Sequence, residues 1–144
     1  MFRGLHNVTM DSKGRIAVPA KHRDVLSKLI VVPNPMPGES CLLVYPIHEW
    51  EQVEADIVSR PNSGSVRQLK RLFLGQAVEY VLDGHGRVLL TPSLREFAGL
   101  DKKLVMVGQG NKFELWDESA WTALRDGEVD DGAAFVEELE SLSF

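Results

Sequence analysis

A short pattern occurs twice in this chain, and the two copies lie half the chain apart. The first copy is Asp-Ser-Lys-Gly-Arg at residues 11–15, and the second is Asp-Gly-His-Gly-Arg at residues 83–87. The offset of 72 residues in a chain of 144 also aligns Arg23 with Arg95. Each copy with its neighbouring residues is too small to bury a core of its own, and such units are stable only when they share a core. The repeat therefore predicts two similar halves that fold together.

Each copy has the residues of a tight turn between two strands. Asp at the first position of a type I turn accepts backbone N–H groups, and Gly at the fourth position tolerates a positive φ. This chemistry assigns structuring roles to Asp11 and Gly14, and to Asp83 and Gly86. Apolar and β-branched residues flank both turns and predict strands. We therefore expect two β-hairpins, which pair residues 5–10 with 16–18 and residues 78–82 with 88–90.

The two halves continue in the same order. A proline after each turn predicts a short helix, and a second β-hairpin follows. The second hairpins are expected to pair residues 28–32 with 41–45 and residues 104–107 with 112–116. The apolar faces of the short helices are expected to carry Val25, Leu26 and Leu29 in the first half and Leu94, Phe97 and Ala98 in the second.

Longer helices are predicted after each half and near the end of the chain. Pro46 is expected at the first position of one helix, and Asp117 is expected to cap its counterpart. An amphipathic helix with Leu69 and Phe73 leads into the second half, and residues 130–142 form a last, acidic helix. The expected organisation is a first unit with its helix at 1–58, a linker and helix at 59–75, a second unit with its helix at 76–125, and an acidic helix or tail at 126–144.

The charges are divided unevenly between the two halves. The net charge at pH 7 is −5, but residues 1–72 contain ten Lys and Arg against seven Asp and Glu. Residues 73–144 contain six Lys and Arg against fourteen Asp and Glu. One face for a polyanion would explain this asymmetry. A solvated charge distribution without a function is the alternative.

Several functional classes lack their required residues. The longest apolar runs are far shorter than the roughly 20 residues of a membrane helix, and no apolar export signal is present, so we expect a cytoplasmic protein without a membrane partner. The single cysteine, Cys41, and four histidines without ligand spacing predict no metal site. Gly84-His85-Gly86 and Gly108-Gln109-Gly110 lack the third glycine of a dinucleotide fingerprint. We expect no catalytic residue, no cofactor and no small-molecule substrate.

Further motifs accompany the two turns. They are Met1-Phe2-Arg3-Gly4, Val18-Pro19, Leu43-Val44-Tyr45-Pro46 with Glu49-Trp50, and Val107-Gly108-Gln109-Gly110-Asn111-Lys112-Phe113-Glu114-Leu115-Trp116. Together with the turns, they resemble the MraZ family of bacterial regulators, which are built from two SpoVT-AbrB-like units. The resemblance runs from Met1 to about Trp121, and no motif after Arg125 matches it.

This resemblance implies a fold, an assembly and a function. The fold would be α+β and β-rich, with two tandem units that form a pseudo-dimeric, swapped-hairpin β-barrel flanked by helices. Several chains would assemble into a ring-shaped homo-oligomer. The function would be that of a sequence-specific, DNA-binding transcriptional regulator, usually a repressor, of the division and cell-wall gene cluster. It would bind repeated boxes in double-stranded promoter DNA, in the cytoplasm at the nucleoid.

The two turns supply the candidate DNA-binding residues. Arginine presents a planar fork that holds a phosphate or the O6/N7 edge of guanine through two hydrogen bonds. Arg15 and Arg87 are therefore expected to contact DNA, with Lys13 as a point charge on its phosphate backbone. His85 takes the place of Lys13 in the second turn, which is less cationic at neutral pH. Arg3 is expected to be a further phosphate contact.

Alternative interpretations stay open. The Asp and Arg of each turn could form only a surface ion pair, which is common at this spacing, although two copies half a chain apart favour a function. The fold could also serve as a protein-interaction module of the AbrB-like antitoxin type, with residues 130–142 as its contact. Lys21, Arg23 and Arg95 are expected to be solvated or capping residues rather than DNA contacts.

Overall fold

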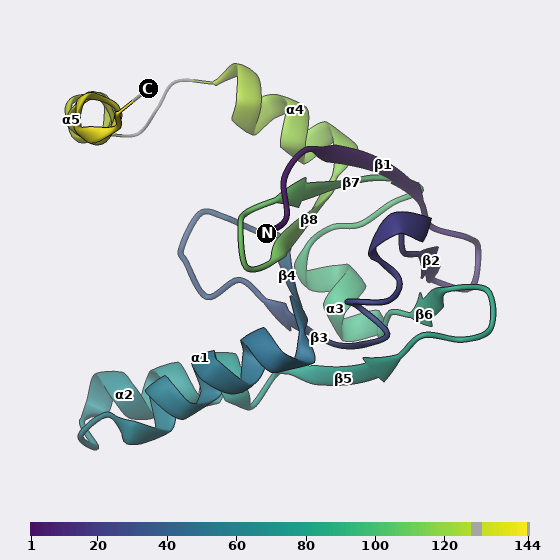
Figure 1. The fold of residues 1–144 in the computed structure, drawn as a ribbon, viewed down its shortest axis with the longest axis horizontal. Coiled ribbons are helices and arrows are strands. Elements are labelled where there is room, and N and C mark those ends of the chain that lie inside the picture. Colours follow the sequence, from purple (N-terminus) through teal and green to yellow (C-terminus); the bar gives the residue numbers. More distant parts are fainter. Residues whose placement is uncertain (128–130, 144) are drawn as a thin grey trace.

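The computed structural model describes residues 1–127 and 131–143 and shows an α+β fold rich in strands (Figure 1). The first half contains β1 (Leu5–Thr9), β2 (Arg15–Ala17), the 3-10 helix η1 (Ala20–His22), β3 (Lys28–Pro33), β4 (Leu42–Pro46) and α1 (Ile47–Ser59). The segment between the halves contains α2 (Gly64–Leu69) and the π-helical turn η2 (Lys70–Leu74). The second half contains β5 (Val78–Val81), β6 (Arg87–Leu89), α3 (Pro92–Phe97), β7 (Lys103–Gly108), β8 (Phe113–Asp117), α4 (Glu118–Asp126) and α5 (Gly132–Ser141).

The strands occupy the predicted positions to within a residue or two, but the turns do not join paired strands. β1 pairs with β7, β2 pairs with β6, and β5 pairs with β3, all antiparallel. The expected hairpins of residues 5–10 with 16–18 and 78–82 with 88–90 are therefore wrong. The physical reason is burial: neither half has enough apolar surface to cover its own strands, so each completes its ladders with strands of the other.

The second hairpins are confirmed. β3 pairs with β4, β7 pairs with β8, and β4 pairs with β8, which joins the two hairpins into one sheet. The six-stranded sheet has the order β1-β7-β8-β4-β3-β5, and β2 with β6 forms a separate two-stranded ribbon. Within the described residues β1 and β5 are not paired with each other, so the hydrogen-bonded ladder of the larger sheet is open at both ends.

The short helix predicted in the first half is replaced by a 3-10 turn. Ten residues separate β2 from β3, whereas thirteen separate β6 from β7, where α3 does form. Leu29 belongs to β3 instead of a helical face, and Val25 is 48% exposed. The central position of β3, between β4 and β5, draws Leu29 into the sheet and leaves too little chain for an α-helix.

The larger sheet is apolar on both faces, and each face has its own cover. Alternate residues of β3 divide between two core clusters: Leu29 and Val31 belong to one, and Ile30 and Val32 to the other. The first cluster also takes in the β2–β6 ribbon through Ile16, Val18, Val88 and Leu90, and α3 through Leu94. The second takes in α1, η2 and α4 through Trp50, Ile57, Phe73 and Trp121. The ribbon and the long helices therefore lie on opposite faces of the sheet.

The predicted helices mostly form. Asp117 caps α4 by accepting a hydrogen bond from the Ser119 N–H at 3.2 Å, as expected. Pro46 precedes α1 as its cap, one position before the expected one. The acidic helix is shorter than residues 130–142 and is exposed along its described length; residues 128–130 and 144 lie outside the described part of the chain. None of the helices in that part is both long and apolar enough to cross a membrane.

Candidate nucleic-acid interface

The first turn is closed by the Asp11 carboxylate. Its Oδ1 accepts hydrogen bonds from the backbone N–H groups of Lys13 and Arg15, at 3.0 and 2.9 Å. Its Oδ2 accepts a third from Arg15 Nε, at 2.6 Å, which makes an ion pair. The Gly14 N–H donates to the Asp11 carbonyl at 3.0 Å, and Gly14 adopts φ +94°. One carboxylate thus orders both the backbone of the turn and the arginine that follows it.

The second turn repeats this arrangement bond for bond. Asp83 Oδ1 accepts from the N–H groups of His85 and Arg87 at 2.8 and 2.9 Å, and Asp83 Oδ2 accepts from Arg87 Nε at 3.1 Å. The Gly86 N–H donates to the Asp83 carbonyl at 3.0 Å, and Gly86 adopts φ +72°. The sequence repeat is therefore also a repeat of geometry.

These hydrogen bonds keep both aspartates ionised. The Arg15 N–H, the largest cause, and the other donors of the turn lower the pKa of Asp11 to about 2, against the opposing effect of burial. The Arg87 N–H likewise lowers the pKa of Asp83. A carboxylate that accepts several N–H bonds is stabilised in its charged form. Both turns are consequently fully formed at neutral pH.

The ribbon places the two arginines on one face. β2 and β6 pair with Arg15 opposite Leu89, Ile16 opposite Val88, and Ala17 opposite Arg87. Ile16 and Val88 are buried, so the alternation of a strand turns Arg15 and Arg87 to the outer face. Their positions are diagonal across the pair, which puts such residues about 7–8 Å apart. Each side chain is 33% exposed, and its ion pair occupies only Nε of the guanidinium.

The other predicted contacts are distributed differently. Lys13 and His85 are exposed at the tips of the turns, and the register of the ribbon puts the two tips at its opposite ends. In Figure 1 both turns lie at the right edge of the molecule, and α1, α2 and α5 lie at its left. Arg3 is exposed beyond the other end of β1, a strand of five residues that spans about 17 Å at 3.4 Å per residue. The structure thus brings Arg15, Arg87, Lys13 and His85 to one ribbon and leaves Arg3 apart from it.

Two arginines that the sequence interpretation set aside belong to this site. An alanine Cβ at position 14 would lie 2.8 Å from Arg95 Cζ, and one at position 86 would lie 2.6 Å from Arg23 Cζ. Each guanidinium therefore lies against the turn glycine of the other half. The 72-residue offset that relates Arg23 to Arg95 was the signal available in the sequence, but the crossing between halves depends on the fold.

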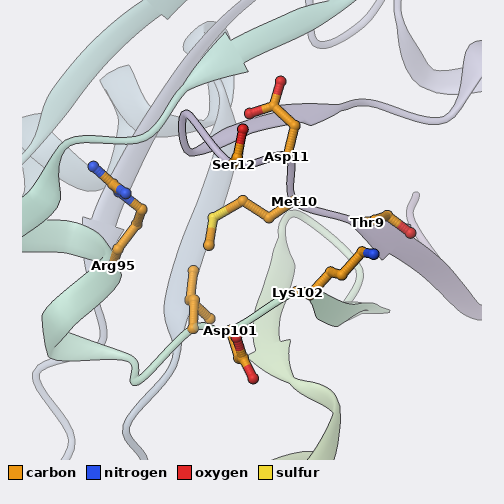
Figure 2. A pocket seen from close by; sticks show the side chains of 8 residues that line it. Thr9, Met10, Asp11, Ser12, Arg95, Asp101 and Lys102 are labelled. Carbon is orange, nitrogen blue, oxygen red and sulfur yellow. The ribbon is translucent and has the colours of Figure 1, made fainter.

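A shallow hollow of about 600 Å³ borders the first turn. Figure 2 shows Met10 between Arg95 and Lys102, with Asp11 and Ser12 beside it. Because two cations line this hollow together with Asp11 and Asp101, its walls have no excess of either charge. The residues that the structure describes also contain no group of three or more metal-ligating side chains.

Comparison with known proteins identifies the family. The family model described as "MraZ protein, putative antitoxin-like" matches residues 1–70 and 73–131. The chain belongs to the MraZ family. Proteins named "Transcriptional regulator MraZ" from Thioalkalivibrio sulfidiphilus and Halorhodospira halophila are 50% and 45% identical to it, each over 99% of both chains. One of the same name from Shewanella oneidensis is 48% identical over 84% of this chain and 82% of its own.

Membership of the MraZ family confirms the resemblance drawn from the motifs. It also agrees with the expectation that the chain is not an enzyme, since its relatives are named as regulators. The family model extends beyond Trp121, where the recognisable motifs end, to residue 131.

Proposed function

We propose that this chain is a transcriptional regulator that binds double-stranded promoter DNA in a sequence-specific manner through the β2–β6 ribbon. The observation that carries the proposal is the common outer face of Arg15 and Arg87, given by the register of the ribbon. A two-stranded β-ribbon fits into the major groove of B-DNA, where an arginine fork recognises the O6/N7 edge of guanine. The printed name of the relatives, a transcriptional regulator, supports the same function.

The remaining candidate residues bind the phosphate backbone of the DNA or shape the turns. Lys13 and His85, at the two tips, bind phosphates on either side of the groove and set the register of the ribbon. Lys13 is the stronger of the two because the second turn has a histidine where the first has this lysine. Arg3, beyond the far end of β1, is a separate phosphate contact. Asp11, Gly14, Asp83 and Gly86 shape the turns and do not themselves bind DNA.

We also propose the strand-swapped arrangement of the two units and the ring assembly that the family resemblance implies. The exchange of strands between the halves supports a pseudo-dimeric, swapped-hairpin arrangement of two SpoVT-AbrB-like units, with limits near residues 58, 75 and 125. A ring of identical chains would place many ribbons along one DNA. Since a single ribbon neutralises few phosphates, and its binding is weak at physiological salt, such avidity is what gives a stable complex.

The proposed target is a set of repeated boxes in the promoter of the division and cell-wall gene cluster, and the proposed effect is repression. The spacing of the boxes should match the spacing of ribbons around the ring, because each chain can reach only one box. The complex would form at the nucleoid, within the cytoplasm.

The proposal is tested by retardation and footprinting with the upstream region of the protein's own operon. We expect evenly spaced protection, with affinity that falls steeply between low and moderate salt. Arg15→Ala should weaken binding roughly five- to 150-fold for each guanine that the arginine recognises. Arg60→Ala is the matched control, since Arg60 is also exposed and ion-paired, to Asp56 at 3.1 Å, but lies at the end of α1. Unchanged binding by a folded Arg15→Ala protein would contradict the site.

A protein-interaction module of the antitoxin type is the second candidate. It is favoured by α5, which is exposed throughout and presents Phe135, Val136 and Leu139 at 48%, 49% and 36% exposure. The family model's description as antitoxin-like is in keeping with it. Footprinting separates the two candidates, because a module of this kind would give no protection of the DNA by the protein alone.

A further inference from the structure

We propose that Arg23 and Arg95 are positioning residues, each of which holds the Asp-x-x-x-Arg turn of the opposite half in place. The consequence for DNA binding rests on the proposed function, whereas the effect on the turns does not. Arg95, on α3 of the second half, acts on the first turn through Gly14. Arg23, directly after η1 of the first half, acts on the second turn through Gly86.

The contact between each guanidinium and its glycine is close. Gly14 and Gly86 are buried, although the residues before them, Lys13 and His85, are exposed. An alanine Cβ at position 14 would lie 2.8 Å from Arg95 Cζ and 2.9 Å from Arg95 Nε, distances that real Cβ atoms do not show. The side chain of Arg95 therefore covers the glycine.

Backbone hydrogen bonds also join each turn to the opposite half. The Gly14 carbonyl accepts a hydrogen bond from the Leu90 N–H at 3.0 Å, and the Gly86 carbonyl accepts one from the Val18 N–H at 2.9 Å. Leu90 and Val18 each follow the ribbon strand of the half opposite to the turn that they bind. Each turn is thus held by one backbone group and one guanidinium of the other half, so its position depends on its partner half.

The two arginines are not equivalent. Arg23 Nε donates to the Val18 carbonyl at 2.8 Å, and Val18 in turn donates to Gly86, so three residues form one bonded unit. Arg95 Nε is buried and has no hydrogen-bond partner in the part of the chain that the structure describes. Arg95 also lines the hollow beside the first turn (Figure 2). Within the described residues, the Nε of Arg23 is therefore held by a hydrogen bond and that of Arg95 by packing alone.

A positioning role explains why these residues matter without contact to DNA. Arg15 and Arg87 each directly follow a turn glycine in the sequence, so a shift of that glycine moves the arginine. Holding a recognition side chain in its binding geometry reduces the entropy that binding must remove. Loss of Arg95 should accordingly weaken the contribution of Arg15, and loss of Arg23 that of Arg87.

The first test uses the full-length protein without DNA. Hydrogen exchange is measured by NMR at the amides of Lys13 and Arg15 in one turn and of His85 and Arg87 in the other. We expect Arg95→Ala to accelerate exchange in the first turn only, and Arg23→Ala in the second turn only. Changes confined to the half that carries the substitution, or no change in either turn, would overturn the proposal.

A conservative variant separates planar contact from charge. Arg95→Lys keeps the positive charge and much of the alkyl stem, so it should fold even if Arg95→Ala does not. Because an ammonium group cannot lie flat on the glycine, we expect the same acceleration in the first turn. Wild-type exchange in Arg95→Lys would show that charge alone holds the turn, and would overturn the role assigned to the guanidinium.

The second test is a double-mutant cycle with promoter DNA. We expect Arg95→Ala to weaken binding about tenfold in the wild-type background and not at all in Arg15→Ala, as for coupled neighbours. In the Arg87→Ala background the full loss should persist. An equal loss in all backgrounds would make Arg95 a direct DNA contact and overturn the positioning role. If the wild-type protein does not bind DNA, the proposed function fails, but the exchange experiment still decides whether the arginines hold the turns.

Discussion

The carboxylate of Asp11 gives the first turn a defined response to acid. Its pKa is lowered from 3.8 to about 2, first by the Arg15 N–H. The carboxylate therefore takes up its proton at a lower pH in the folded state than in the unfolded state. The stabilisation is therefore complete above pH 3.8 and is lost as the pH falls toward 2. We expect the Arg15 amide resonance to titrate with a midpoint near pH 2. Asp11→Asn should abolish this titration, and a midpoint at the ordinary pKa would contradict the hydrogen-bond arrangement.

Gly14 is required for two separable reasons, its positive φ and the contact with Arg95. Gly38 has a similar φ, +82° against +94°, but an added Cβ there would meet no atom within 4 Å. A non-glycine residue at positive φ costs of order 1–3 kcal/mol. We expect Gly38→Ala to lower the free energy of unfolding by about that amount and Gly14→Ala by more, in urea denaturation. Equal losses at the two positions would show that Arg95 moves aside without cost.

The β2–β6 ribbon depends on its surroundings. Its strands have three residues each, and an isolated two-stranded ribbon is only marginally stable in water. Ile16 and Val88 anchor it in the core, at 3% and 4% exposure, so the burial of its inner face fixes the orientation of its outer face. The outer face, which carries Arg15 and Arg87, is therefore held in place by the core below it.

The last helix, α5, differs from the ribbon because its described residues are exposed. Every described residue of α5 is exposed, including Phe135 and Leu139, so the helix adds little to the buried core. We expect deletion of residues 128–144 to leave the thermal midpoint and the affinity for promoter DNA unchanged, because stability comes from burial. The measurements are differential scanning calorimetry and gel retardation. A fall in the midpoint of several degrees would show that α5 packs on the rest of the molecule, and a loss of DNA binding alone would assign it to assembly.

The pairing between halves makes the molecule one cooperative unit. A fragment of residues 1–59 would lack the strands β7, β6 and β5, which pair with its own strands β1, β2 and β3 respectively. We expect it to be largely unfolded as a monomer, and addition of residues 60–144 to restore the native NMR spectrum. Measurement at low concentration prevents the fragment from pairing with itself. A monomeric fragment with native chemical-shift dispersion would contradict the need for exchange between the halves.

The local features of this protein were determined by the sequence itself. The Asp and Gly positions predicted two turns, and short runs rich in apolar and β-branched residues predicted all eight described strands to within a residue or two. The repeat and its motifs also identified the family. These predictions succeed because turn chemistry, capping and strand composition depend on residues only a few positions apart.

The partners of those elements were decided only by the tertiary structure. Proximity in the chain favoured β1 with β2, yet burial paired β1 with β7 and β2 with β6, which set Arg15 and Arg87 on one face. The same crossing laid Arg23 and Arg95 on the glycines of the opposite turns. Such pairing depends on the apolar surface that both halves contribute to one core, a sum over distant residues that no local pattern contains.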